Sequence, residues 1–455
     1  MNLPKYPKYK NSGVEWLGDV PEHWDVSRFK KVFKERRQKS VSGGEELLSV
    51  SSYYGVKRKL ETIEEGEYLS RAESLEGYKV CEPGDLVMNI MLAWNRGLGF
   101  AWQHGIVSPS YSVFSVTDRS DPRFLDYLVR SDEYIRYFKA FSYGVIDSRL
   151  RLYPEMFGRL SCALPSSDEQ STIAAFLDHE TARIDALIEE QKRLIKLLKE
   201  KRQAVISHAV TKGLDPNVPM KDSGVEWLGE VPAHWAKVRL KHVLKRIIDT
   251  EHKTAPVQED GSYLIVRTSN VRDGALVFSD AKYTDYEGFV EWTRRGVPAP
   301  GDVLFTREAP AGEACVVPKG VDLCLGQRMV LFKPKKDRVL SDFVVYSLYA
   351  GLSEEFVESL SQGSTVAHFN MSDIGNIPLF EPPLSEQEKI VGDINRRLHV
   401  FDSLISEAKS SVDLMHERRS ALISAAVTGK IDVRDWQRPA SSSLTEQSAT
   451  EGAPA

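Results

Sequence analysis

The chain has 455 residues, of which 42% are hydrophobic and 27% are charged, with 60 basic residues against 65 acidic ones. This length exceeds that of one typical domain, and the composition is that of a folded globular protein, which excludes disordered, collagen-like and disulfide-stapled classes. The net charge of −5 excludes general polyanion binding by the whole surface, so any contact with nucleic acid must rest on local basic patches.

The N-terminal sequence and the cysteines indicate the cellular location. Residues 1–10 (MNLPKYPKYK) lack the apolar core of a signal peptide, and no segment reaches the roughly 20 apolar residues of a membrane span. The cysteines form no C-x-x-C pair, which favours reduced and buried thiols at Cys81, Cys162, Cys315 and Cys324. We therefore expect a cytoplasmic protein with no membrane contact.

An internal repeat organises the chain. Residues 12–18 (SGVEWLG) recur without change as residues 223–229, and residues 20–24 (VPEHW) return as residues 231–235 (VPAHW), both at an offset of 211. Further blocks match at an offset of 217, namely Pro83-Gly84-Asp85 with Pro300-Gly301-Asp302 and Glu169-Gln170 with Glu386-Gln387. This period is too long for a solenoid and indicates a duplicated domain. The ends of the two repeats are similar and their middles differ, which favours a common scaffold that carries two different recognition regions. The alternative is an old duplication whose two halves have simply diverged.

Each repeat opens with short apolar runs that are typical of strands. These runs are residues 47–50, 85–88 and 111–116 in the first repeat, and residues 263–266, 302–305 and 328–332 in the second. Residues 123–141 and 340–360 then carry apolar residues at helical spacing, which indicates one or two helices beside a sheet. The pattern predicts an α+β domain in each repeat.

A long helix is predicted after each domain. Over residues 168–210 and again over residues 385–427, apolar residues recur at alternating steps of four and three, which is typical of a coiled-coil seam. The predicted seams contain Ile173, Leu177, Ile184, Leu187, Leu194, Leu198 and Val205 in the first helix, and Ile390, Ile394, Phe401, Leu404, Ala408, Met415 and Leu422 in the second. Each segment would span about 65 Å at roughly 1.5 Å per residue. We expect the two helices to pair with each other; two separate amphipathic helices, each on its own domain, are the alternative.

Motifs for catalysis are missing. Gly429-Lys430 lacks the earlier glycine of a phosphate-binding loop, Gly97-Leu98-Gly99 lacks the third glycine of a dinucleotide fingerprint, and neither H-E-x-x-H nor G-x-S-x-G occurs. His23 and His234 lie inside the repeated P-x-H-W motif, where packing against the tryptophan is expected. The sequence therefore predicts no catalytic and no metal-binding residue in this chain.

Two basic stretches recur at matching places. Residues 28–39 hold seven Lys or Arg against one Glu, and residues 237–246 hold five with no acid. A charge run is usually a solvated face, but its recurrence in both repeats favours contacts to DNA phosphates. The predicted phosphate contacts are Lys30, Lys31, Lys34, Arg36, Arg37, Lys237, Arg239 and Lys241.

Base reading is expected from the divergent middles, where turns after strands mix small hydroxyls with long hydrogen-bond donors. Ordinary polar loops are the alternative at each place. The candidates in the first repeat are Ser51, Ser52, Tyr53, Tyr54, Lys57, Arg58, Asn89, Arg96, Ser108 and Tyr111. The candidates in the second repeat are Arg267, Thr268, Ser269, Asn270, Arg272, Arg307, Gln327, Arg328, Ser364, Thr365 and His368.

Together these motifs resemble the specificity subunit of type I restriction-modification enzymes. The resemblance is carried by the W-L-G…V-P-x-H-W blocks, the P-G-D turn, the helix start at residues 383–390 (PLSEQEKI) with residues 165–173 as its looser first copy, and the helix end at residues 417–432 (ERRSALISAAVTGKID). It covers nearly the whole chain except the tail.

The resemblance implies an α+β fold with two α/β target recognition domains, joined by two long antiparallel coiled-coil helices in an internal pseudo-two-fold repeat. The implied division is a first target recognition domain at 1–165, a first spacer helix at 166–212, a second recognition domain at 213–382, a second spacer helix at 383–430 and a disordered tail at 431–455.

The resemblance also implies the partners. Each repeat would read one half of a bipartite site in double-stranded DNA, and the paired helices would set the spacing and dock two modification (methyltransferase) subunits. Restriction (translocase/nuclease) subunits would join the complex. No cofactor is expected in this chain, whereas S-adenosylmethionine, ATP and Mg²⁺ are expected on the partner subunits. Two other classes of protein are the alternatives. A free-standing enzyme would need a cluster of cofactor-binding or metal-binding residues, and a coiled-coil scaffold would not need basic patches repeated in both halves.

Overall fold

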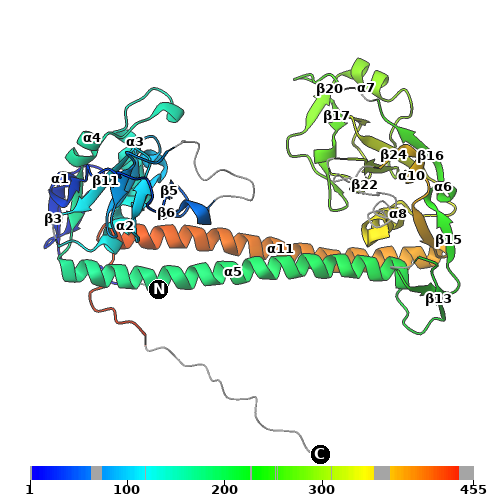
Figure 1. The fold of residues 1–455 in the computed structure, drawn as a ribbon. Helices are drawn as coiled ribbons and strands as arrows, with labels where there is room; N and C mark the ends of the chain where they lie inside the picture. Colours follow the sequence, from blue (N-terminus) through cyan, green and yellow to red (C-terminus); the bar gives the residue numbers. More distant parts are fainter. Residues whose placement is uncertain are drawn as a thin grey trace, which may run out of the picture. The chain divides into compact units, whose positions relative to one another are not determined.

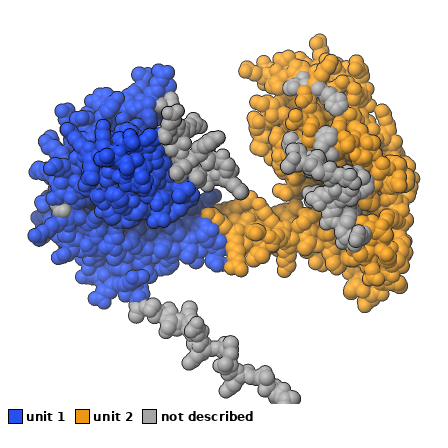
Figure 2. All heavy atoms as spheres, viewed as in Figure 1, with its two compact units in different colours: residues 1–191, 411–455 blue, residues 192–410 orange. Residues whose placement is uncertain are grey.

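The computed structural model describes residues 3–62, 74–117, 119–225, 228–251, 253, 255–308, 310–352 and 369–439 (Figure 1). The chain divides into two compact units (Figure 2). Unit 1 comprises residues 1–191 and 411–455, and unit 2 comprises residues 192–410. Each unit therefore holds the folded domain of one repeat together with segments of both long helices.

Unit 1 is built on a four-stranded antiparallel sheet. Its strands are β4 (Phe33–Glu35), β11 (Tyr111–Val116), β8 (Leu86–Asn89) and β9 (Leu98–Phe100), in the order β4–β11–β8–β9. Both faces of this sheet are covered, because Leu86 and Met88 belong to the main core whereas Val87 belongs to a second, smaller core. That smaller core includes residues of the hairpin formed by β5 (Leu48–Ser51) and β6 (Gly55–Arg58), and of the pair β7 (Lys79–Cys81) and β10 (Gly105–Val107).

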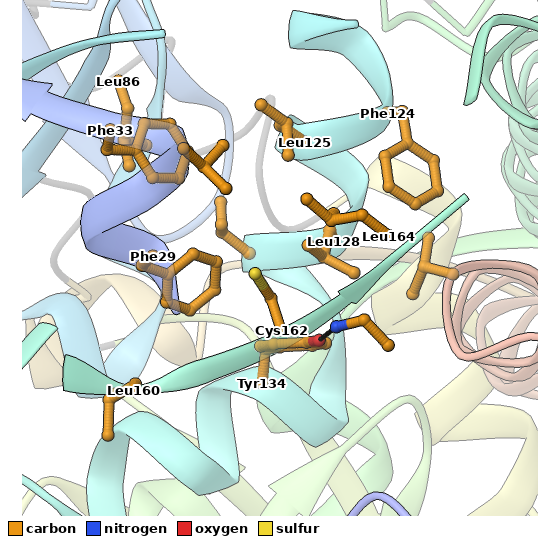
Figure 3. Packing of buried hydrophobic residues seen from close by; sticks show 14 of the residues in the cluster. Phe29, Phe33, Leu86, Phe124, Leu125, Leu128, Tyr134, Leu160, Cys162 and Leu164 are labelled. Carbon is orange, nitrogen blue, oxygen red and sulfur yellow. Dashed lines mark hydrogen bonds between the residues drawn. The ribbon is translucent and has the colours of Figure 1, made fainter. Parts of the chain in front are cut away.

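The main core of unit 1 lies between the sheet and three helices, α1 (Phe29–Val32), α2 (Pro122–Arg130) and α3 (Asp132–Ala140). Figure 3 shows aromatic and aliphatic side chains from these helices around Cys162 of β12 (Ser161–Leu164). Phe29 stacks on Phe157 of α4 (Pro154–Arg159) with ring centroids 4.7 Å apart. Helix α2 begins at a capped turn, because the Asp121 side chain accepts a hydrogen bond from the Arg123 amide.

Unit 2 repeats the same sheet with different additions. Its strands β16 (Leu244–Asp249), β24 (Met329–Pro334), β21 (Val303–Thr306) and β22 (Ala314–Val316) follow the order β16–β24–β21–β22. A three-stranded sheet of β20 (Lys282–Thr284), β17 (Tyr263–Val266) and β23 (Leu323–Leu325) carries helix α7 (Tyr286–Trp292). The six strands predicted from the sequence are present within two residues of their predicted bounds, and the internal repeat is confirmed.

Small β-ribbons and short helices complete both units. In unit 1, β1 (Tyr9–Asn11) pairs with β2 (Asp19–Pro21), and β3 (Asp25–Arg28) pairs with β12. In unit 2, β13 (Met220–Asp222) pairs with β14 (Glu230–Pro232), and β15 (Ala236–Arg239) pairs with β25 (Pro378–Glu381). The described part of unit 2 also contains the short α-helices α6 (Leu240–Val243), α8 (Ser341–Ser347) and α10 (Met371–Ile374).

Two long helices, α5 (Ser167–Lys212) and α11 (Leu384–Val427), confirm the prediction of a long helix after each domain (Figure 1). Within unit 1 the start of α5 packs against the end of α11 in one core, and Arg419 Nε donates to Asp185 at 2.9 Å. Within unit 2 the end of α5 packs against the start of α11, and Arg202 Nε donates to Asp402 at 3.2 Å. The two helices are therefore antiparallel in each unit.

The predicted coiled-coil seam is buried near the helix ends, but three of its residues near the middle are exposed. Leu187 and Leu404, assigned to the seam, are 45% and 43% exposed, whereas their neighbours Ile188 and Ile405 are 2% and 8% exposed. The reason is the helical period, because a straight α-helix with 3.6 residues per turn drifts by about 20° per heptad from a 3.5-residue repeat. Leu194, also assigned to the seam, is 43% exposed.

All four cysteines are buried, as predicted. Burial raises the pKa of Cys81, Cys315 and Cys324 to about 12. A thiol with such a pKa is protonated at neutral pH and therefore weakly nucleophilic.

Candidate nucleic-acid interface

The repeated motifs meet around one carboxylate in each unit. In unit 1, Glu169 on α5 accepts hydrogen bonds from Tyr6 Oη at 2.7 Å and from Trp24 Nε1 at 3.0 Å, and lies 2.7 Å from His23 Nε2. Burial and the hydrogen bond to Glu169 raise the pKa of Tyr6. The His23 ring lies with its centroid 5.6 Å from that of Tyr6, so His23 packs inside this cluster. We call this cluster of Tyr6, His23, Trp24 and Glu169 the unit 1 junction.

The unit 2 junction has the same design. Glu386 on α11 accepts a hydrogen bond from Trp235 Nε1 at 3.0 Å and lies 2.8 Å from His234 Nε2. The glutamines that follow the two glutamates extend both junctions: Gln170 Nε2 donates to the Pro165 carbonyl at 3.0 Å, and Gln387 Nε2 donates to the Pro382 carbonyl at 2.9 Å. The E-Q motif thus fastens each domain to the helix that begins there.

Each junction also contacts the helix that ends in the same unit. Gly429, after α11, has a φ of +72°, and a Cβ atom there would lie 2.4 Å from Pro21 Cδ. Gly213, after α5, has a φ of +76°, and a Cβ atom there would lie 3.4 Å from Trp235 Cζ2. The duplicated V-P-x-H-W block is therefore the place where one long helix starts and the other one ends.

The P-G-D turns accept cations from neighbouring strands. Arg36 donates to the Asp85 carboxylate from Nε at 2.7 Å and from Nη2 at 3.1 Å, and this contact raises the pKa of Arg36. In unit 2, Lys333 Nζ lies 2.7 Å from Asp302. Arg36, predicted as a phosphate contact, is thus bound to a buried carboxylate of its own unit.

The other predicted phosphate contacts differ between the repeats. Lys30 and Lys31 lie exposed on α1, whose Phe29 and Val32 are buried, and Lys34 and Arg37 are exposed on or just after β4. In the second repeat the cations contact their own domain: Lys237 Nζ donates to the Gly224 carbonyl at 2.9 Å, and Arg239 and Lys241 donate to Asn376 Oδ1 at 3.3 and 2.9 Å. The first basic stretch therefore presents the more accessible cations.

The predicted reading residues of unit 1 meet at a hollow of about 680 Å³ beside α11. Its lining includes Ser52, Tyr53 and Tyr54 from the β5–β6 turn, Arg96 from the loop before β9, and Trp102, Arg123, Tyr127, Arg130 and Arg419. The side chain of Tyr53 is 94% exposed, and Arg96 forms an ion pair with Asp132. Three carboxylates, Asp126, Asp132 and Asp178, also line the hollow. Of its lining, the exposed aromatic ring and the guanidinium groups are the components suited to a nucleic-acid contact.

The remaining candidates of unit 1 lie around this turn or inside the fold. Lys57 Nζ is 5.5 Å from the Tyr54 ring centroid, and burial raises the pKa of Tyr111. Asn89 is 4% exposed, and its Oδ1 accepts the Met91 amide at 3.0 Å. The other three have local partners: Ser51 Oγ accepts the Tyr53 amide, Ser108 Oγ bonds Ser110 Oγ, and Arg58 lies near Glu46 and Glu61.

In unit 2 the predicted arginines pair within the domain. Arg267 contacts Asp280 at 2.9 Å, Arg307 contacts Asp249 at 3.2 Å, and Arg328 contacts Glu308 at 3.0 Å. Arg272 Nη1 donates to the Thr268 carbonyl at 2.9 Å, Asn270 is fully buried with Nδ2 donating to the Val277 carbonyl, Ser269 is exposed and Gln327 is half-buried. Ser364, Thr365 and His368 lie outside the described residues.

Sequence reasoning missed a loop between α3 and α4. It presents large apolar side chains to solvent, which are Phe141 (45% exposed), Tyr143 (57%), Val145 (99%), Ile146 (52%) and Tyr153 (45%). Arg149 and Arg151 lie in the same segment. The sequence does show a dense run of apolar residues around Gly144 that could have indicated this loop. The run lies just after residues 123–141, which were interpreted as helical.

Two searches of the described residues found no further site. None of their helices combines the length and the hydropathy that a bilayer crossing needs. The same residues contain no group of three or more His, Cys, Asp or Glu side chains placed to hold a metal ion.

Comparisons with known proteins identify the class of the second repeat. Residues 232–411 match the family model described as the type I restriction modification DNA specificity domain. The type I restriction enzyme MjaVIII specificity subunit of Methanocaldococcus jannaschii is 23% identical over 435 residues, which cover 91% of this chain and 95% of that protein.

Two solved structures share the fold. The first is a chain from a structure described as "Structural basis underlying complex assembly and conformational transition of the type I R-M system". It aligns with a TM-score of 0.66 at 18% identity, and the alignment covers 90% of this chain and 98% of that chain. The HsdS subunit from Thermoanaerobacter tengcongensis aligns with a TM-score of 0.51 at 18% identity and the same coverage.

These matches confirm the resemblance predicted from the repeated motifs: the second repeat matches the type I DNA specificity domain, and the chain is similar over most of its length to a type I restriction enzyme specificity subunit. DNA sequence specificity is the general function of this family. The matched domain is named for DNA specificity and the curated relative for its specificity role, so the interpretation as a non-catalytic recognition subunit is confirmed.

Proposed function

We propose that this chain reads an asymmetric, bipartite site in double-stranded DNA for a type I restriction-modification complex, with one half-site read by each unit. The observation that carries this proposal is the duplicated frame. The same four-stranded sheet and the same glutamate junction occur twice, around turns of different chemistry. Tyr53 is exposed at the turn of unit 1, whereas the candidate arginines Arg267 and Arg307 of unit 2 are paired with carboxylates.

The long helices are proposed to set the gap between the half-sites. Helices α5 and α11 contain 46 and 44 residues, and each is fastened to a domain by a junction. Two readers related by approximate two-fold symmetry fit half-sites about one DNA turn, roughly 34 Å, apart. The division into recognition domains at 1–165 and 213–382 with spacer helices at 166–212 and 383–430 remains part of this proposal.

The exposed middle of the helices is proposed as the place where two modification subunits bind. In unit 2, large apolar side chains on both helices are exposed although the flanking segments are packed: Leu194 and Leu197 on α5, and Val400 and Leu404 on α11. Exposed apolar surface on a helix pair favours a protein partner. Restriction subunits would complete the complex. The partners would supply S-adenosylmethionine, ATP and Mg²⁺ chemistry, and this chain would hold none of them.

The test is a genome-wide map of methylated adenine by single-molecule sequencing, in source cells with and without this gene. Loss of one bipartite, gapped motif on disruption supports the proposal and gives both half-sites. An unchanged map, in cells where the modification partner is expressed, contradicts it.

Shortening the helices tests the spacing directly. Deleting seven residues from the middle of each helix should bring the domains about 10 Å closer, or about three base pairs, and leave both half-sites unchanged. An unchanged gap would refute the role of the helices as a spacer.

A further inference from the structure

We propose that Arg130 in unit 1 and Tyr349 in unit 2 are positioning residues, each of which holds the base-reading turn of its own unit and thereby determines what that half-site can be. This inference rests on the proposed function, because it assumes that the two turns read DNA. The turns are Ser51–Gly55, between β5 and β6, and the turn between β18 (Val271–Arg272) and β19 (Ala275–Leu276). Neither positioning residue is predicted by the sequence patterns.

In unit 1 a single guanidinium joins the turn to the main sheet. Arg130, the last residue of α2, donates from Nη1 to the Leu98 carbonyl of β9 at 2.6 Å. Its Nη2 donates to the carbonyls of Ser52 and Tyr53, each at 3.4 Å. The backbone of the turn is therefore held by a side chain, while the Tyr53 ring is 94% exposed.

Two glycines make room for this guanidinium. A Cβ atom on Gly55 would lie 2.9 Å from Arg130 Nη1, and a Cβ atom on Gly99 would lie 3.3 Å from it. Gly55 also has a φ of +77°, which a residue with a side chain rarely adopts. The turn and strand β9 can approach each other only because both positions lack a side chain.

The surroundings of Arg130 favour a structural contact over a phosphate contact. Desolvation lowers the pKa of Arg130, while the half-buried Asp126, one turn earlier on α2, partly offsets that effect. Asp126 is itself held in place, because its Oδ1 accepts the Phe100 amide of β9 at 3.0 Å. Arg130 and Asp126 are therefore both bound to β9, at the edge of the sheet on which the turn rests.

In unit 2 a tyrosine from the helical segment after α8 holds the corresponding turn. Tyr349 Oη accepts the Gly274 amide at 2.9 Å and the Ala314 amide of β22 at 3.2 Å, and it donates to Glu313 Oε2 at 2.6 Å. Glu313 in turn accepts the Asp273 amide at 2.9 Å. Strand β22 has the place in its sheet that β9 has in unit 1, so the two turns are held at the same point of the frame.

The two contacts are chemically different at equivalent places. A guanidinium binds carbonyl oxygens in unit 1, whereas a phenol hydroxyl binds amide groups in unit 2. Asp273 and Gly274 have φ values of +51° and +88°, a left-handed turn that the Tyr349 hydroxyl and Glu313 stabilise from one side. Each unit can therefore present a differently shaped turn on the same sheet, as two different half-sites require.

The test uses the full chain in its native complex and reads the two halves of the methylated motif separately. Replacing Arg130→Met should lower the discrimination between bases in one half of the motif by about tenfold and leave the other half unchanged. Tyr349→Phe, which removes only the hydroxyl, should do the same to the other half. Arg130→Lys should restore part of the discrimination, because an ammonium group can still bind one carbonyl.

Arg136→Met is the matched control. Arg136 lies on the neighbouring helix α3; its side chain is 76% exposed and, among the ion pairs of the described residues, contacts only Glu133. This variant should change neither half of the motif. Equal relaxation of both halves by Arg130→Met, or no change in either half, would overturn the proposal.

A second measurement separates this inference from the proposed function. Hydrogen exchange of the backbone amides of residues 51–58 should become about tenfold faster in Arg130→Met and remain unchanged in Arg136→Met. Unchanged exchange in Arg130→Met would overturn the positioning role even if a bipartite motif is found. If the wild-type chain directs no bipartite methylation, the proposed function fails, and the exchange result alone decides whether Arg130 holds the turn.

Discussion

Removal of the junction glutamates should destabilise the two units unequally. The Glu169 side chain is 6% exposed, whereas that of Glu386 is 28% exposed. Replacing Glu169→Ala leaves two buried donors, Tyr6 Oη and Trp24 Nε1, without their acceptor. At about 1–3 kcal/mol for each buried donor, the expected loss is about 2–6 kcal/mol. Glu386→Ala leaves one such donor, Trp235 Nε1, at a place that water can reach, with an expected loss of about 1–2 kcal/mol.

The assay is urea unfolding followed by hydrogen exchange and mass spectrometry, which reports peptides of each unit separately. A single optical signal is unsuitable because a chain with two units is not expected to unfold in one step. With an m-value of about 2–3 kcal/mol/M, Glu169→Ala should lower the midpoint of unit 1 by about 0.7–3 M. Glu169→Gln retains one oxygen acceptor and should give an intermediate shift. Equal shifts for Glu169→Ala and Glu386→Ala would refute the reasoning from burial and donor count.

Three further predictions concern the helix ends, the basic stretch and the thiols. Gly429→Ala should destabilise the chain more than Gly213→Ala in thermal unfolding, because its Cβ atom would lie 2.4 Å from a proline ring instead of 3.4 Å from a tryptophan ring, at similar positive φ; an equal loss would contradict this. Replacing both Lys30 and Lys31 by Gln should reduce the slope of log K against log salt for DNA binding by about 2, with both half-sites retained, and an unchanged slope would show that they do not contact phosphate. Burial raises the pKa of three thiols to about 12, against about 8.5 in an unfolded chain. The native chain should therefore resist thiol reagents at pH 8 until urea is added, and its stability should fall as the pH rises above about 9, because only the unfolded state ionises these thiols there; fast labelling of the native chain would refute this.

The frame was predictable because its signals are local in the sequence. Strands β8 and β24 are short apolar runs, and α5 and α11 carry a helical period over more than 40 residues. The repeat made the assignment stronger, because the same blocks appear twice. The middle of the seam was wrong because a heptad count accumulates error against the 3.6-residue period of a straight helix.

The site was less predictable because a side chain's partner can lie far away in the sequence. In the sequence Arg36 looks like a surface cation. In the fold its guanidinium binds Asp85, which lies 49 positions later in the chain. Arg307 meets Asp249 across 58 positions in the same way. The exposure of Tyr53 could be predicted because a turn after a strand exposes its tip. The contact of Arg130 with the turn could not, because nothing near Arg130 in the sequence indicates it. The candidate residues outside these contacts remain predictions.

The discontinuity of unit 1 has a consequence for biosynthesis. Unit 2 is one uninterrupted segment, residues 192–410, and all of its packing partners leave the ribosome together. Unit 1 receives part of its core, including Ala426 and Val427, from the end of the chain. At about 5–20 residues per second, the ribosome needs roughly 10–45 s to make the intervening 220 residues. Throughout that interval Ile173 and Leu177 lack their partners from α11, so the first half of the nascent chain depends on protection until the last helix is made.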